Sequence, residues 1–155
     1  MRGMALYFRR HDGEAATTND FVDSIVEGAQ QDGLPLGFDP AQFERWYLQA
    51  GTPTVQVHRQ WESSLGRLTL RFVQNTAPTP GQPDKKPLVI PLLWAVVDAD
   101  GTPAEERLLV LDQAEQTVVV EGLSPQPQPP ALSLFRQFSA PVSYTHLTLP
   151  TICSV

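Results

Sequence analysis

The sequence predicts an α+β chain in which short helices are followed by an all-β sandwich. Apolar residues recur at helical spacing as far as about residue 50, and from Thr54 onward they alternate with a period of two. All but two of the 15 prolines lie after residue 50. The stretch from Thr52 to Pro141 contains about six or seven short strand patterns, which is typical of a sandwich. These observations assign residues 1–52 to a helical part and residues 53–141 to a sandwich domain.

Three start and stop signals predict the helices. Met4, Tyr7 and Phe8 have helical spacing, and His11-Asp12-Gly13 is a typical helix exit. Thr17 with Asp20 has the capping-box pattern and predicts a second helix that ends near Gly33. Asp39 followed by Pro40 predicts a third helix that ends at Gly51. The apolar stripe of the second helix is Phe21, Val22, Ile25, Val26 and Ala29, and that of the third is Phe43, Trp46, Tyr47 and Ala50.

Strands are predicted wherever apolar and polar residues alternate. The first two are centred on Val55–His58 and Leu68–Phe72, with a turn between them at residues 62–66. A proline-rich loop at residues 77–87 precedes a buried strand at 88–97, in which Pro91 requires an edge or a bulge. Asp100-Gly101 predicts a hairpin turn. Further strands are expected at residues 107–111, 117–121 and 132–138.

Charge and composition exclude several classes of protein. The 155 residues carry a net charge of -6, and 41% of them are hydrophobic, so the chain is neither a disordered tail nor a basic nucleic-acid binder. The longest apolar run, Leu88–Val97, is too short for a membrane span, and the first residues lack the pattern of a secretory signal. A cytoplasmic protein with no nucleic-acid or membrane partner is therefore expected. The single cysteine, Cys153, excludes an intrachain disulfide.

The last fourteen residues, 142–155, contain no Asp, Glu, Lys or Arg. Val142–Leu147 resembles the translation of the transposon end used in sequencing libraries, and Thr148–Thr151 resembles the adjoining adapter. We interpret residues 142–155 as an artefactual tail and expect that it has no partner in the fold. The alternative is a genuine final strand, because Tyr144, His146 and Thr148 alternate with the residues between them.

No group of residues in this sequence has the spacing of a catalytic or metal site. His11-Asp12 is better explained by a helix-ending turn than by an acid–base pair. His58 is predicted to point outward from its strand, without further donors spaced to complete a zinc site. Asp98-Ala99-Asp100-Gly101 lacks the final bidentate glutamate of a calcium loop. Glu105-Glu106 is typical of a solvated strand edge, with the two side chains pointing to opposite faces.

Two further patterns have a structural and a binding interpretation. The run Ser124–Pro130 contains a Pro-x-x-Pro spacing that suits a polyproline ligand, although a stiff connection between strands explains it better. Trp46-Tyr47 could stack on a ligand, but an aromatic stripe on a helix is usually part of a core. We therefore assign no catalytic, cofactor-binding or metal-binding residue.

A set of short strings spread across residues 1–141 carries a family resemblance. The strings are Tyr7–Gly13, Ala15–Thr17, Asp20–Val22, Phe43–Tyr47, Gln49–Pro53, Thr79–Pro83, Lys86–Pro87, Ile90–Pro91, Ala114–Thr117 and Phe138–Pro141. Together they resemble the bacterial-type aminopeptidase N family, whose members are zinc metallopeptidases of the gluzincin group. Thr18 stands where that family often has a cysteine, and residues 32–40 form a longer connection than usual.

The resemblance implies a place for this chain within a larger enzyme. Residues 1–52 would be the last helices of a thermolysin-like catalytic domain, followed by an immunoglobulin-like sandwich and, in the parent, by a helical domain. The family's zinc motif and its substrate-binding motif are not found in this sequence, so zinc and peptide substrates would belong to the parent alone. Without their catalytic-domain partners, the helices should expose apolar residues among Met4, Phe8, Trp46 and Tyr47. The alternative hypothesis is a self-contained sandwich that binds peptide or glycan, which would present an exposed aromatic platform.

Overall fold

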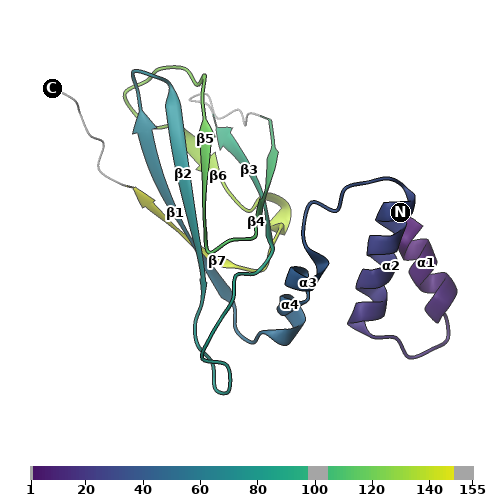
Figure 1. Cartoon of the computed structure of the whole chain (residues 1–155). Coiled ribbons are helices and arrows are strands. Elements are labelled where there is room, and N and C mark those ends of the chain that lie inside the picture. The colour runs from purple at the N-terminus through teal and green to yellow at the C-terminus, as the bar shows by residue number, and fades with distance from the viewer. Residues whose placement is uncertain (1, 98–104, 149–155) are drawn as a thin grey trace. The chain divides into compact units, whose positions relative to one another are not determined.

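The computed structural model describes residues 2–97 and 105–148 (Figure 1). The chain divides into two compact units, Met1–Leu48 and Gln49–Val155. The described helices of the first unit are α1 (Arg2–His11), α2 (Thr18–Gln31), α3 (Pro40–Phe43) and α4 (Arg45–Leu48). The described strands are all in the second unit. The two units are considered separately below.

The ends of α1 and α2 follow the predicted signals. Gly13 has a φ of 80° and gives α1 a left-handed exit. Thr17 is the N-cap of α2: its hydroxyl accepts a hydrogen bond from the backbone N–H of Asp20, and the Asp20 carboxylate accepts one from the backbone N–H of Thr17. This capping box satisfies two backbone donors that the first turn of a helix leaves free.

The third predicted helix is interrupted at Glu44 and forms two short helices instead of one. Asp39 caps α3 through the backbone N–H of Ala41, as the sequence predicts. The carbonyl of Glu44 then accepts hydrogen bonds from the N–H groups of both Tyr47 and Leu48. The bond from Tyr47 spans three residues, so the backbone of α4 is tightened toward a 3₁₀ turn.

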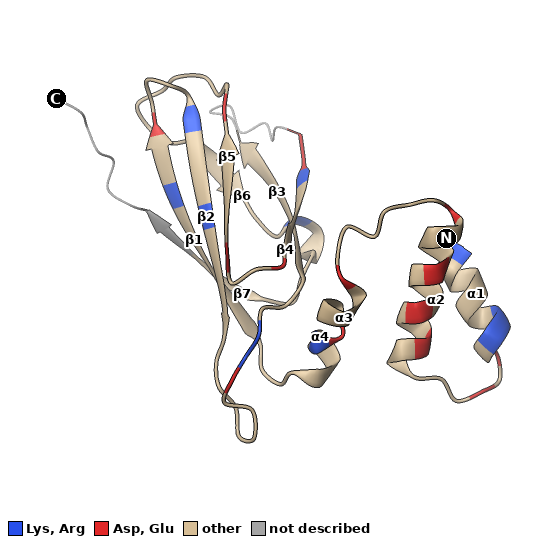
Figure 2. Cartoon of the chain, viewed as in Figure 1, with Lys and Arg blue, Asp and Glu red and all other residues tan. Residues whose placement is uncertain are grey.

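Helices α1 and α2 pack against each other through small residues. Gly3, Ser24 and Gly28 are the buried residues of this pair, and a Cβ atom at Gly28 would lie only 2.3 Å from the backbone nitrogen of Gly3. Arginines on α1 face acidic residues on α2 (Figure 2), with ion pairs from Arg2 to Asp32 and from Arg10 to Glu27. No large apolar side chain in the described part of this unit is fully buried. The helical unit therefore has no hydrophobic core of its own.

The second unit is a two-layer β-sandwich (Figure 1). One sheet has the strand order β5-β2-β1-β7 and the other has the order β4-β3-β6. The strands are β1 (Pro53–Glu62), β2 (Arg67–Thr76), β3 (Ile90–Val97), β4 (Arg107–Leu111), β5 (Glu115–Val120), β6 (Ala131–Ser133) and β7 (Ser143–Thr148). The α+β class and the sandwich that the sequence predicts are thus both present.

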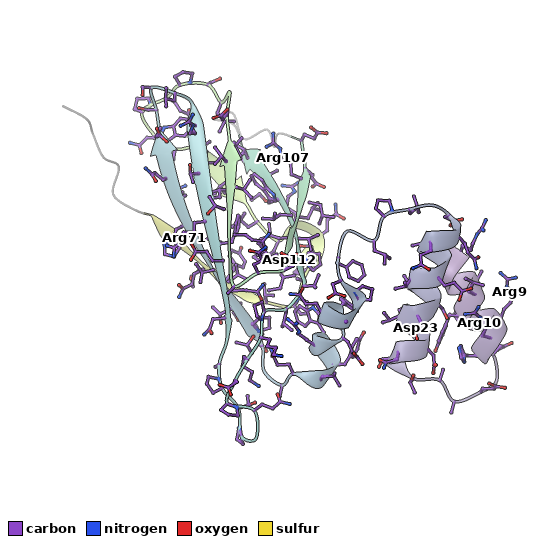
Figure 3. All side chains as sticks on the ribbon, in the orientation of Figure 1. Arg9, Arg10, Asp23, Arg71, Arg107 and Asp112 are labelled. Carbon is purple, nitrogen blue, oxygen red and sulfur yellow. The ribbon has the colours of Figure 1, made fainter. Side chains whose placement is uncertain are left out.

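The core lies between the two sheets and is formed by the predicted inward positions. Alternate residues of β1 and β2 are buried, whereas most of their neighbours are exposed or half-buried. The guanidinium of Arg107, labelled in Figure 3, lies 5.7 Å from the ring centre of the buried Trp94. The largest buried apolar side chains are Trp94, Phe72, Leu68, Leu70, Leu88, Ile90, Leu92 and Leu111.

Pro91 lies where its missing N–H does no harm. Strand β3 pairs with β4 over residues 90–94 but with β6 only over residues 95–97. At Pro91, β3 therefore has only β4 as a neighbour among the described strands, which is the edge environment that a proline in a strand requires.

The predicted strand at residues 132–138 is wrong beyond Ser133. Strand β6 has only three residues, and a single 3₁₀ turn, η1 (Arg136–Phe138), follows it. Phe135, Gln137 and Phe138 all have positive φ angles, between 51° and 55°, which no strand can accommodate. The turn is held by polar contacts of Arg136, which binds the Glu106 carboxylate and the hydroxyl of Ser133.

The expectation that the tail has no partner in the fold is wrong for residues 143–148. These residues form β7, which pairs in parallel with β1, and the ring of Tyr144 lies 4.9 Å from that of Phe135. The other side of β1 is paired with β2, so β1 would otherwise present unpaired backbone groups. An alternating segment such as Tyr144–Thr148 satisfies them. The expected hairpin at Asp98–Gly101 and the lone Cys153 lie outside the described residues.

Candidate functional site

His11 and Asp12 belong to the helical unit, and His58 belongs to the sandwich unit. His11 and Asp12 lie where α1 ends, and the ring of His11 packs at 5.4 Å from that of Tyr7. His58 lies in β1, opposite Arg71 of β2, and alternates with the buried Val55 and Val57 as predicted. His11 therefore contributes to local packing at the end of α1, and His58 lies on the solvated face of the sheet.

The outer face of the four-stranded sheet carries a well-formed ion pair between Arg71 and Glu115. Arg71, labelled in Figure 3, binds Glu115 of β5 through two guanidinium nitrogens, with Nε–Oε1 at 2.5 Å and Nη2–Oε2 at 2.8 Å. The hydrogen bonds from Arg71, with a smaller Coulomb contribution from His58, hold the pKa of Glu115 below the ordinary value of a glutamate. Both side chains are about half exposed, so this pair stabilises the sheet only modestly.

Replacing Arg71 by glutamine is expected to raise the pKa of Glu115 toward its ordinary value. Because folding lowers this pKa, ionised Glu115 stabilises the fold above the ordinary glutamate pKa, and this contribution is lost as the pH falls through the folded-state value. The wild type should therefore exceed Arg71→Gln slightly in stability at neutral pH and match it in acid. NMR titration of the Glu115 carboxyl tests the expected pKa, and urea unfolding at neutral and at acidic pH tests the expected difference in stability. Equal titration midpoints for Glu115 in the two proteins would contradict it.

The acidic pair Glu105-Glu106 and the proline-rich run Ser124–Pro130 lie in segments that connect or flank strands. Glu105 and Glu106 are exposed and precede β4, and Glu106 binds Arg136. The run Ser124–Pro130 connects β5 to β6 and is held by a 2.8 Å hydrogen bond from the Trp61 indole to the carbonyl of Gln126. This contact supports the interpretation of the run as a stiff connection.

The helical unit exposes apolar side chains, as expected. Phe8 and Tyr47 are 58% and 52% exposed, Met4 is 38% exposed, and Trp46 is half-buried. The aromatic stripe of α4 is therefore not enclosed in a core within this chain.

No metal site is formed by the described residues. Among the side chains that the structure describes, in residues 2–97 and 105–145, no three His, Cys, Asp or Glu are grouped so that they could hold an ion. A catalytic zinc needs three such ligands, so the described residues do not fit that group. That the chain has no catalytic or metal-binding residue stays a prediction of the sequence.

A buried amide connects several elements of the sandwich. The side chain of Gln74 in β2 exchanges hydrogen bonds with the backbone N–H and carbonyl of Leu88, at 2.9 and 3.0 Å. Its amide nitrogen also donates to the carbonyls of Gln113, at 2.8 Å, and Leu111, at 3.4 Å. Gln74 thereby joins β2 to the segment before β3 and to the turn between β4 and β5.

A second polar group surrounds the residues that precede β1, and we call it the junction cluster. Its members are Gln49, Ala50, Thr79, Gln82, Lys85 and Lys86. The Lys85 ammonium donates to the Ala50 carbonyl, the Thr79 hydroxyl and the Gln82 side-chain oxygen, at 2.8, 2.7 and 2.9 Å. The amide of Gln49 binds the backbone N–H and carbonyl of Lys86, at 2.8 and 3.1 Å.

Two glycines shape the backbone of the junction cluster. Thr79 and Gln82 exchange backbone hydrogen bonds across a turn that contains Pro80 and Gly81, and Gly81 has a φ of 78°. Pro-Gly at the centre of a turn with this φ is typical of type II. Gly51 has a φ of 100°, and a Cβ there would lie 3.1 Å from the Thr76 methyl group. The hydrogen bonds of the junction cluster go largely to backbone groups of Ala50 and Lys86, so the cluster holds backbone in place.

Sequence reasoning did not identify Gln74 or the junction cluster. Neutral amides have no spacing rule that marks a buried network, and the partners of Gln74 lie up to 39 residues away. The Thr-Pro-Gly-Gln string was the available signal, because it predicts the turn that presents Thr79 and Gln82 side by side.

Comparison with known proteins places these units in a wider context. Residues 51–146 match the model of a family described as a domain of unknown function (DUF3458) with an Ig-like fold. Aminopeptidase N of Escherichia coli strain K12 is 38% identical over 149 residues, and that of Caulobacter vibrioides is 44% identical over 143 residues. These alignments cover 91% and 92% of this chain but only 16% and 15% of the relatives.

A solved structure also matches nearly all of this chain and a small part of a longer protein. The crystal structure of Legionella pneumophila aminopeptidase A in complex with aspartic acid superimposes with a TM-score of 0.70 at 27% sequence identity. The match covers 92% of this chain and 15% of that chain. The present chain therefore spans about one-sixth of the length of the proteins it is similar to.

Proposed function

This chain belongs to the DUF3458 family of Ig-like fold, and from that premise we propose that it is a structural, non-catalytic segment of a zinc-dependent aminopeptidase that removes N-terminal residues from peptides. In this proposal the zinc, the peptide substrate and the catalytic residues belong to the longer parent protein. The helices up to residue 52 are the end of a thermolysin-like catalytic domain, residues 53–141 form the sandwich, and a helical domain follows in the parent.

The extent of the similarity to aminopeptidase N carries the proposal. An alignment confined to the sandwich unit could include at most residues 49–155, yet the alignments cover 91% and 92% of the chain. The similarity thus extends into the helical unit. A sandwich that was used as an independent module would have no need of these particular helices.

The exposed apolar residues of the helices support the same proposal. Met4, Phe8 and Tyr47 are each at least 38% exposed, and the described helical unit has no buried large apolar side chain. Exposed apolar surface of this kind is usually covered by a protein partner. The catalytic domain of the parent is the partner that we propose.

We also propose a cytoplasmic location for the parent protein, as expected from the sequence. None of the helices that the structure describes is long and apolar enough to cross a membrane.

The alternative, a self-contained sandwich that binds peptide or glycan, is less well supported. In the described part of the sandwich, the exposed aromatic side chains are Phe138, at 99%, and Tyr144, at 46%. The ring of Tyr144 already packs on Phe135. One fully exposed ring does not form the flat platform of several rings that such a module would present.

The test is a chimaera in which this chain replaces the aligned 149 residues of E. coli aminopeptidase N. Because the segment is proposed to support the catalytic domain, the chimaera should hydrolyse an alanyl reporter, with activity within about tenfold of the parent. An unrelated Ig-like sandwich of equal length in the same place is the control and should abolish activity, because it lacks the helices. A chimaera that folds but has no more activity than this control would contradict the proposal.

The isolated chain provides the second arm of this test. It should fold, bind no stoichiometric zinc and release no product from the reporter, since zinc must be ligated before it can activate water. Tight zinc binding at one ion per chain together with turnover would overturn the proposal.

A further inference from the structure

The chain between α4 and β1 has no regular structure of its own. Residues 49–52 follow the last helical residue, Leu48, and precede Pro53, and Ala50 and Gly51 are exposed. A short exposed connection with a glycine is ordinarily among the first parts of a protein to open. Here, however, Gln49 and Ala50 are both held by hydrogen bonds to the proline-rich loop at residues 77–87.

The contacts of the junction cluster secure consecutive backbone groups of this connection. Both backbone groups of Ala50 are bound: its N–H donates to the side-chain oxygen of Gln82 at 2.8 Å, and its carbonyl accepts from Lys85. Gln49 is bound through its side-chain amide to the backbone of Lys86. Gln49 is accordingly the first residue of the sandwich unit.

Lys85 is the central member of the junction cluster. Its ammonium donates to the carbonyl of Ala50 in the connection. It also donates to the side-chain oxygens of Thr79 and Gln82, the two residues that flank the Pro80-Gly81 turn. The Gln82 oxygen accepts from Lys85 and from the Ala50 N–H at once, so the ammonium also orients the acceptor that Ala50 uses. A lysine carries three tetrahedral donors and can serve three converging acceptors, whereas a methionine of similar length serves none.

We propose that Lys85 is a positioning residue that fastens the connection at residues 49–51 to the sandwich, so that the chain enters β1 in one fixed conformation. The cluster makes this connection part of the rigid sandwich rather than a flexible linker. The proposal concerns the sandwich unit alone and does not depend on the parent being an aminopeptidase.

Hydrogen exchange in the full chain tests this inference with a matched pair of variants. In Lys85→Met, the Ala50 amide should exchange about tenfold faster, because its acceptor is no longer held, while the amides of Val55 and Val57 keep their wild-type rates. Lys86→Met is the control: it removes the neighbouring ammonium but leaves the backbone contacts of Lys86 and should change none of these rates.

A milder variant protects the test against a folding failure. Thr79→Val removes one of the three acceptors of Lys85 without changing the size of the side chain. Hydrogen exchange of the Ala50 amide should become faster by a smaller factor than in Lys85→Met, while the amides of Val55 and Val57 again keep their wild-type rates. An unchanged Ala50 rate in Lys85→Met overturns the proposal. Equal acceleration of Ala50, Val55 and Val57 also overturns it, because Lys85 would then act on global stability and not on the connection.

Discussion

Replacing Gln74 by leucine is expected to lower the free energy of unfolding by about 3 kcal/mol or more. Leucine has nearly the same volume but cannot hydrogen-bond, so the Leu88 N–H and the carbonyls of Leu88 and Gln113 lose their Gln74 partner. Each buried polar group left without a partner costs about 1–3 kcal/mol. Urea unfolding followed by tryptophan fluorescence measures the loss, because Trp61 and Trp94 are buried in the sandwich.

Gln60 provides the matched control for Gln74. It is an exposed glutamine on the neighbouring strand β1, and Gln60→Leu should change stability by no more than about 0.5 kcal/mol. If both leucine variants unfold at the same urea concentration, the buried hydrogen bonds of Gln74 contribute nothing and the argument from desolvation fails.

Replacing Gly66 by alanine is expected to have an effect of similar size. Gly66 lies in the turn between β1 and β2 with a φ of 57°, and an added Cβ would lie 2.0 Å from the carbonyl oxygen of Leu123. The left-handed backbone alone costs alanine roughly 1–2 kcal/mol. The contact requires the backbone of Leu123 to move, at a further cost of about 1–3 kcal/mol. Thermal or urea unfolding of the variant measures the sum.

The variant Gly81→Ala separates the cost of the left-handed backbone from the cost of the contact with Leu123. Gly81 also has a positive φ, 78°, but an added Cβ there would meet no atom within 4 Å. Gly81→Ala should therefore show only the backbone cost, and the difference between the two variants should equal the cost of the contact with Leu123. Indistinguishable stabilities of Gly66→Ala and Gly81→Ala would rule out that contact as a source of destabilisation.

The features that the sequence predicted well depend on residues close together in the chain. The start of α2 needs only Thr17 and Asp20, and the inward positions of β1 and β2 need only the alternation of apolar residues. The resemblance to aminopeptidase N, carried by strings such as Tyr7–Gly13, is confirmed by relatives at 38% and 44% identity. Local patterns and family resemblance together account for the fold class.

The features that the sequence did not predict depend on partners distant in the chain. The left-handed turn at Phe135–Phe138 follows an apolar pattern that suits a strand, but Arg136 bonds to Glu106, and Ser139 accepts from the N–H of Leu93. The pairing of β7 depends on the open side of β1 and not on the composition of the tail. The junction cluster requires Gln49 and Lys86 to meet across 37 residues.

The parallel pairing of β1 and β7 determines how the sandwich responds to mechanical tension. Thr54–Arg59 of β1 lies beside Ser143–Thr148 of β7, and both strands run in the same direction. A force that pulls the start of β1 and the end of β7 apart acts along the strands in opposite directions. All the hydrogen bonds between the two strands then share the load in shear, whereas two antiparallel strands pulled from the same open end would separate one bond at a time. In this chain, the sandwich would therefore respond to such tension as a stiff mechanical link and not as an extensible one.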